Sequence, residues 1–198
     1  WAGGMLVGGD YSYLYLQNSL AYNFAKWTGL SVKAGDFSPD GAIRVMGAFN
    51  RSPPISADVY VAGDFTNIYP PGAAGIPASR IVTTNSLFGI GWQAMGAGFN
   101  ATVRAIEKHN GSLYVGGDFT ASGATPIGYI ARWTGSAWQQ VGLGLNGPCY
   151  ALKSYNGYLY AGGTFTSAGG SATGGLGRFD GTNWLTVGGF FSGSVYAL

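Results

Sequence analysis

Charged residues and cysteine are scarce in this sequence of 198 residues. Ten Lys and Arg against eight Asp and Glu leave a net charge of +2, too weak a field for nucleic-acid binding. The single cysteine, Cys149, cannot form an internal disulfide, so stability must come from packing. Long uninterrupted apolar runs are also missing, and we therefore expect no insertion into a membrane.

The residue types that build most catalytic centres are equally few. His109 is the one histidine, and its predicted place in a turn favours a solvated side chain over a metal ligand. Glu107 is the one glutamate, and Cys149 falls in a predicted inner strand, where a small buried hydrophobe is expected. No nucleophile, base and orienting group can be assembled from these residues. We therefore predict no catalytic residue, no metal site and no cofactor.

Glycine, by contrast, is abundant, as are apolar and aromatic residues. The 36 glycines have no three-residue period, so they indicate tight turns rather than a collagen-like chain. Apolar residues make up 46% and aromatic residues 15% of the chain, enough to form a packed core. No segment shows sustained helical periodicity, which excludes helical repeats and favours an all-β fold.

A pattern of four short strands, here named A to D, recurs four times along the chain. Strand A is predicted to start near residues 43, 103, 149 and 195. Strand B ends in a pair of small residues at 8–9, 62–63, 116–117 and 162–163, followed by Asp10, Asp64, Asp118 and Thr164. Strand C carries a cation, at Lys26, Arg80, Arg132 and Arg178. Strand D opens with Val32, Trp92, Trp138 and Trp184.

These strands alternate and are bounded by turn residues, which is typical of antiparallel hairpins. Asn-Gly at 110–111 and 156–157 favours a primed turn between strands A and B. A lone sheet of this kind is apolar on both faces, so the copies must stack, and twisted sheets repeated radially form a propeller. The sequence therefore predicts a single β-propeller domain, residues 1–198, with four four-stranded blades.

The two ends of the chain are in phase with the repeat. The chain begins at a strand B and stops at a strand A, so Val195–Leu198 is expected to complete the blade that Met5–Val7 begins. Such closure removes free sheet edges. The alternative is that the chain is an excerpt of a longer propeller.

The repeat resembles the kelch family. LYVGGDFT at 113–120, IARWTGSAW at 130–138 and LYAGGTFT at 159–166 are most similar to repeats of secreted and cell-surface proteins of the fungal cortical-polarity-marker type and their bacterial relatives. RFDGTNW at 178–184 is similar to the kelch motif YDPxTNxW. The resemblance covers nearly the whole chain and implies a β-propeller displayed at a surface, with a binding role.

Candidate binding residues come from segments that do not repeat, because repeated residues indicate scaffold. We interpret the aspartates after strand B as caps of turn amides and the strand C cations as scaffold. Three segments are interpreted as insertions: 10–22, 48–58 and 67–79. Their tyrosines and prolines offer rigid contact area. The predicted ligand- or partner-binding residues are Tyr11, Tyr13, Tyr15, Arg51 and Tyr69.

The expected function is a non-enzymatic binding or structural module of an extracellular, cell-surface or virion-surface protein. It would recognise a protein or glycan partner through loops, and it could join other subunits of a larger assembly. Two alternatives remain open, a purely architectural assembly domain and a carbohydrate-active enzyme, because fold alone does not decide chemistry.

Overall fold

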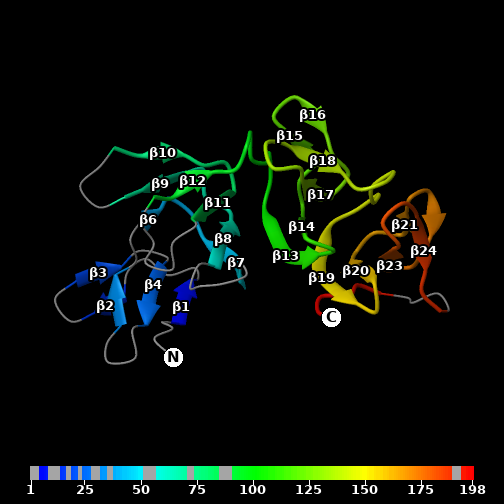
Figure 1. Ribbon diagram of the computed structural model, residues 1–198, viewed down its shortest axis with the longest axis horizontal. Coiled ribbons are helices and arrows are strands. Elements are labelled where there is room, and N and C mark those ends of the chain that lie inside the picture. The colour runs from blue at the N-terminus through cyan, green and yellow to red at the C-terminus, as the bar shows by residue number, and fades with distance from the viewer. Residues whose placement is uncertain are drawn as a thin grey trace. The chain divides into compact units, whose positions relative to one another are not determined.

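Figure 1 shows the computed structural model, which describes residues 5–8, 14–16, 19–21, 24–27, 32–34, 38–50, 57–70, 74–84, 91–188 and 193–198. Every element among these residues is a β-strand, and all the strand pairs are antiparallel, so the all-β prediction is confirmed. Within the same ranges no helix could cross a membrane. The chain divides into two compact units, Trp1–Met95 and Gly96–Leu198. The single-domain propeller stays a prediction.

The unit Gly96–Leu198 contains two four-stranded meanders with the predicted A-B-C-D order. The first consists of β13 (Val103–His109), β14 (Ser112–Gly117), β17 (Ile130–Trp133) and β18 (Trp138–Gln140). The second consists of β19 (Cys149–Tyr155), β20 (Tyr158–Gly163), β23 (Leu176–Phe179) and β24 (Trp184–Thr186). Asn110 and Gly111 at the first A-B turn have φ angles of 46° and 78°, which confirms the primed turn.

The unit Trp1–Met95 contains one meander of the same order and a smaller sheet. The meander consists of β7 (Ile43–Asn50), β8 (Ala57–Gly63), β11 (Ile81–Thr84) and β12 (Gln93–Ala94). The smaller sheet has the order β1 (Met5–Gly8), β4 (Phe24–Trp27) and β5 (Val32–Ala34). Strand A therefore starts at residues 43, 103 and 149 as predicted, whereas 195–198 forms no strand.

Strand register corrects the predicted position of Arg80. Ala62 of β8 pairs with Ile81, and the corresponding Gly116 pairs with Ile130. Arg80 therefore corresponds to Tyr129, not to Arg132, and the prediction that Arg80 is a strand C cation was wrong. Arg80 and Tyr129 share left-handed φ angles of 72° and 61°. The error arose because Ile81–Thr84 lacks the pair of a cation and an aromatic residue that marks the other copies, at 26–27, 132–133 and 178–179.

A small hairpin lies between strands B and C of every sheet. The hairpins are β2 (Leu14–Leu16) with β3 (Ser19–Ala21), β9 (Asn67–Tyr69) with β10 (Ile76–Pro77), β15 (Ala121–Ser122) with β16 (Thr125–Pro126), and β21 (Ser167–Ala168) with β22 (Ser171–Ala172). β6 (Ser38–Pro39) adds a third strand beside β9.

Segments 10–22 and 67–79 therefore contain a repeated element, and their interpretation as non-repeated insertions was wrong. In segment 48–58, residues 48–50 belong to β7 and residues 57–58 to β8, whereas residues 51–56 lie outside the described residues.

A polar clamp precedes strand A in three repeats, at Asp40, Asn100 and Asn146. The Asn100 Oδ1 atom accepts hydrogen bonds from the backbone amides of Thr120 (2.9 Å) and Ala121 (3.1 Å), and Asn100 Nδ2 donates to Thr120 Oγ1 at 3.0 Å. Asn146 binds Thr166 and Ser167 in the same way. Asp40 Oδ1 also accepts from the backbone amides of Thr66 and Asn67, but its Oδ2 atom accepts from Thr66 Oγ1 and Asn67 Nδ2. The clamp ties each loop before strand A to the turn after strand B, beside a buried phenylalanine: Phe65, Phe119 or Phe165.

The clamp also sets the ionisation of Asp40. Burial raises the pKa of its carboxyl group, but hydrogen bonds from Asn67 and Thr66 outweigh burial and lower that pKa from 3.8 to about 2. Asp40 is therefore a carboxylate at neutral pH. Its stabilising contribution is present above pH 3.8 and is lost as the pH falls through about 2.

Strand A of one repeat packs on the small-residue pair of the repeat before it. A Cβ atom added at Gly116 would lie 3.0 Å from the Cβ atom of Cys149, the first residue of β19. One added at Gly162 would lie equally close, 3.0 Å, to the Cβ atom of Val195, whose amide donates to the Gly163 carbonyl oxygen at 3.0 Å. Val195 therefore takes the place of a strand A start.

We predict that replacing the clamp side chain destabilises the protein. Asn100→Ala removes three side-chain hydrogen bonds and should lower the free energy of unfolding by about 1–2 kcal/mol in chemical denaturation. Asn100→Asp, which copies Asp40, is the matched control and should retain most of the stability at neutral pH. Equal stability of the Ala and Asp variants would contradict the clamp.

Candidate functional site

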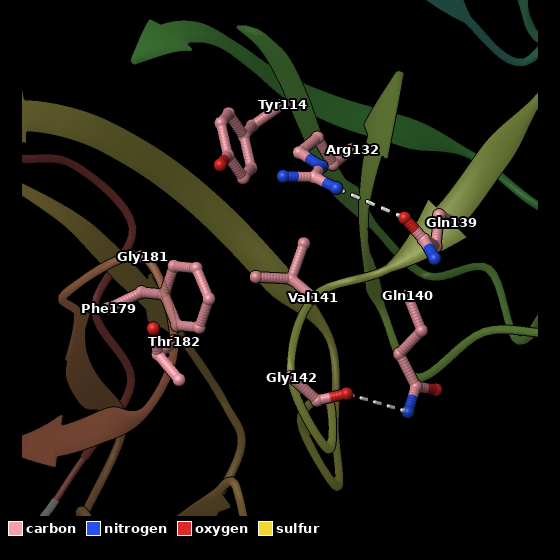
Figure 2. Close-up of a pocket in the computed structure, with 9 residues that line it drawn as sticks. All are labelled: Tyr114, Arg132, Gln139, Gln140, Val141, Gly142, Phe179, Gly181 and Thr182. Atoms are coloured by element: carbon pink, nitrogen blue, oxygen red, sulfur yellow. Dashed lines mark hydrogen bonds between the residues drawn. The ribbon is translucent and has the colours of Figure 1, made fainter. Parts of the chain in front are cut away.

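A pocket of about 290 Å³ lies in the unit Gly96–Leu198, where its two large sheets meet. One wall comes from the first sheet, with Tyr114, Arg132, Gln139 and Gln140. The other comes from the end of β23 and the turn that follows, with Phe179 and Thr182. Figure 2 shows the Arg132 guanidinium and the Tyr114 ring on one side of this space and the Phe179 ring and Thr182 on the other. No lining residue is acidic.

Strand pairing positions the polar side chains of the first wall. Arg132 of β17 lies opposite Gln139 of β18 in the ladder, so both side chains point to the same face. Arg132 Nη2 donates a hydrogen bond to Gln139 Oε1 at 3.1 Å. An amide oxygen carries no full charge, so this bond leaves the guanidinium charge uncompensated. Arg132 is the only charged residue among the described residues that line the pocket, because the Asp180 carboxylate caps the turn at Thr182 and is not part of the lining.

Gln140 is held by the loop beneath it. Its Oε1 atom accepts from the Gly128 amide at 2.9 Å, and its Nε2 atom donates to the Gly142 carbonyl oxygen at 3.3 Å. The indole Nε1 of Trp184 donates to the Val141 carbonyl oxygen at 3.0 Å and so joins the two sheets under the pocket. Both walls are thus fixed before any ligand arrives, which lowers the entropic cost of binding.

None of the predicted binding residues is among the described residues that line this pocket. Tyr11, Tyr13 and Arg51 lie outside the described residues. Tyr15 lies in β2, opposite Leu20, and its side chain is also outside the described part. Tyr69 lies in β9, is 46% exposed and packs its ring on Gly75. Sequence reasoning noted Arg132 but assigned it to the scaffold, and Gln139, Gln140 and Thr182 gave no signal.

Two of the aspartates that follow strand B, Asp64 and Asp118, form ion pairs with strand A. Arg44 binds Asp64, and Arg104 binds Asp118 through two donors, with Nη2–Oδ2 distances of 2.7 Å in both pairs. Arg44 and Arg104 sit at a β-bulge of strand A, which aims each side chain at its aspartate. Asp10 lies outside the described residues. Among those described, no group of three His, Cys, Asp or Glu side chains could hold a metal ion.

Tyrosine replaces arginine at the same strand A position in the last repeats. Tyr150 occupies the bulge of β19, and the Arg104 guanidinium lies over its ring at 5.3 Å. The Tyr196 ring stacks on the Tyr150 ring, with the two centroids 5.2 Å apart and the planes inclined by 4°. Thr164 stands after strand B in this repeat, so the arginine and its aspartate are both replaced. The stack links neighbouring copies of strand A.

His109 is buried, and the prediction that it is solvated was wrong. Its side chain is 2% exposed and lies between β13 and β19. Asn110 Nδ2 donates to Nε2 at 3.1 Å, so Nδ1 carries the proton and donates to Ser154 Oγ at 2.8 Å. Burial lowers the pKa of His109, and the nearby carboxylate of Glu107 opposes this only in part. Glu107 itself accepts a hydrogen bond from the Ser154 amide at 2.9 Å.

Cys149 is the small buried hydrophobe that the sequence predicts. Its side chain is fully buried, and the thiol is free. Burial raises the pKa of this thiol to about 12. A thiol of this kind is unreactive at neutral pH.

No protein-family model matches the chain, and no curated protein matches it. The kelch-like interpretation therefore rests on the motifs of the chain itself.

We predict that the protein loses stability as the pH falls below 6.5, because the unfolded chain then binds a proton that buried His109 resists. Chemical denaturation between about pH 7.5 and about pH 5.5 should show this loss. His109 is the only histidine, so His109→Gln should flatten this part of the stability curve. An NMR titration that places the folded pKa of His109 above 6.5 would contradict the prediction.

Proposed function

We propose that this chain is a non-enzymatic binding module, built as a β-propeller of four kelch-like blades and displayed by an extracellular, cell-surface or virion-surface protein. The repeated A-B-C-D meanders support the blades. The motifs LYVGGDFT and IARWTGSAW, which resemble repeats of surface proteins, support the location.

The pocket beside Arg132 is the observation that carries the binding role. Its polar side chains are fixed before binding, and they present amide, hydroxyl and guanidinium groups. Its lining includes no carboxylate, imidazole or thiol that could act as a base or nucleophile. A set of donors and acceptors without such groups suits recognition of a glycan or protein partner rather than turnover.

Blocking the pocket tests the binding role. The labelled wild-type protein is first applied to a glycan and peptide array to find the ligands that it binds. Thr182 is exposed and lines the pocket, so Thr182→Trp should fill the pocket and abolish binding to these ligands. Ser136 holds the corresponding turn position of the preceding repeat and does not line the pocket, so Ser136→Trp is the matched control. Equal binding by the Thr182 variant and the wild type would refute the pocket as the binding site.

Ring closure tests the four-bladed fold. In the register of β13 with β14, Ile106 pairs with Val115, and the corresponding pair would be Leu198 with Val7. Val7→Cys with Leu198→Cys should therefore form an intramolecular disulfide in the monomer. The buried Cys149 thiol should not interfere, because its pKa is about 12.

Val7→Cys with Ala197→Cys is the control for that experiment, because neighbouring strand residues face opposite sides of a sheet. A disulfide that forms only between two chains would indicate that Val195–Leu198 pairs with a second chain rather than closing the ring of its own chain. No disulfide in the first double variant would favour the excerpt of a longer propeller.

A further inference from the structure

We infer that the pocket beside Arg132 binds an acidic saccharide, with the carboxylate of one sugar ring placed on the Arg132 guanidinium. This inference rests on the proposed function, since it names the ligand class of the same pocket. Three features of the described residues lead to it: the charge of the pocket, its neutral polar groups and its difference from the other repeats.

The charge argument compares Arg132 with the other arginines. Arg44 and Arg104 are neutralised by Asp64 and Asp118. Arg132 makes no ion pair among the described residues, is exposed, and spends one donor on the amide oxygen of Gln139. Because the guanidinium fork has five donors, most of its hydrogen-bonding capacity remains for a ligand. Its geometric complement is a carboxylate, which it can bind through two parallel hydrogen bonds.

The neutral groups indicate a hydroxylated ligand. Thr182 presents a hydroxyl and Tyr114 a phenol to this space, and Gln139 adds an amide beside Arg132, whereas the Gln140 amide is held by Gly128 and Gly142. Phe179 adds an apolar surface against which the carbon face of a sugar ring can pack. A volume of about 290 Å³ is at the lower end of ligand pockets, so one ring fits rather than a long chain. A peptide that docks by its side chains would need an apolar anchor pocket, whereas most side chains of this lining are polar.

The arrangement does not recur in the neighbouring repeats. Arg178 corresponds to Arg132, but it faces Leu185 in the ladder and lies over the Tyr158 ring at 4.6 Å. In the repeat before, the ladder position of Arg132 is held by Thr83, opposite Gln93. An exposed arginine beside a glutamine therefore occurs once among the three large described sheets. Scaffold positions repeat, so this departure points to a ligand.

The test is a calorimetric titration of the whole chain with the methyl glycosides of glucuronic acid, galacturonic acid and sialic acid. Methyl glucoside and methyl galactoside are the neutral counterparts, and acetate is the free carboxylate. At least one acidic glycoside should bind about tenfold or more tightly than its neutral counterpart and than acetate.

Variants assign the binding to Arg132. Arg132→Gln should weaken the acidic glycoside about tenfold or more and leave affinity for the neutral one unchanged. Arg132→Lys keeps the charge but loses the planar fork, so it should restore only part of the affinity. Lys153→Gln removes one positive charge from an exposed side chain outside the pocket, where Lys153 pairs with Glu107 at 3.7 Å, and is the control for net charge. Thermal unfolding of each variant checks that the fold is retained.

Each other outcome overturns the inference. Equal affinity for acidic and neutral glycosides would show that the pocket does not recognise the carboxylate. Equal affinity for the acidic glycoside and acetate would show that it does not recognise the sugar ring. Binding of N-acetyl-aspartate amide with the same dependence on Arg132 would identify an acidic protein segment instead. If no acidic glycoside binds while array positives are still lost in Thr182→Trp, the inference fails and the proposed function stands. If Thr182→Trp binds all array positives as the wild type does, the pocket is not the binding site, and the inference and the role of the pocket in the proposed function both fail.

Discussion

The close approach of backbone to backbone at the end of strand B is the constraint on which the described sheets depend. At Gly63, Gly117 and Gly163 an added Cβ atom would overlap the carbonyl oxygen of the loop before strand A. The next residue, such as Asp118, donates its amide to that same carbonyl, at 2.9 Å from Thr102 in this repeat. No side chain larger than that of glycine fits between them. The glycine therefore fixes how the strand A-B pair is closed, and the clamp at Asn100 reinforces it from the loop side.

The first residue of the small pair has a different role. Gly116 and Gly162 leave room for Cys149 and Val195, so the following copy of strand A can pack directly on strand B. Ala62 takes this position in the second repeat and is fully buried. The second residue of the pair thus lets strands A and B of one sheet close on each other. The first residue lets strand A of the next repeat pack closely on strand B. Cys149 is buried because it occupies the space that the missing side chain leaves, and this burial keeps its thiol protonated.

Most of the strand framework could be predicted from the sequence, because it follows from these local requirements. The repeated motifs predicted the starts of strand A at residues 43, 103 and 149 and of strand D at residues 32, 138 and 184 correctly. The hairpins between strands B and C could not be found, since strands of two or three residues show no periodicity. His109 was misplaced because only the fold shows that Ser154, 45 residues away, covers it.

The candidate site could not be predicted for a related reason. Its walls come from two sheets, and no local pattern brings Thr182 to Arg132. Repetition also concealed it: Arg132 and Arg178 look equivalent in the sequence, yet Gln139 beside one and Leu185 beside the other give the two guanidinium groups different surroundings. The scaffold is set by residues that every repeat needs, such as the glycine pair and the clamp. A ligand site requires only that one repeat differ where the scaffold does not depend on the residue, and the face of β17 and β18 meets that condition.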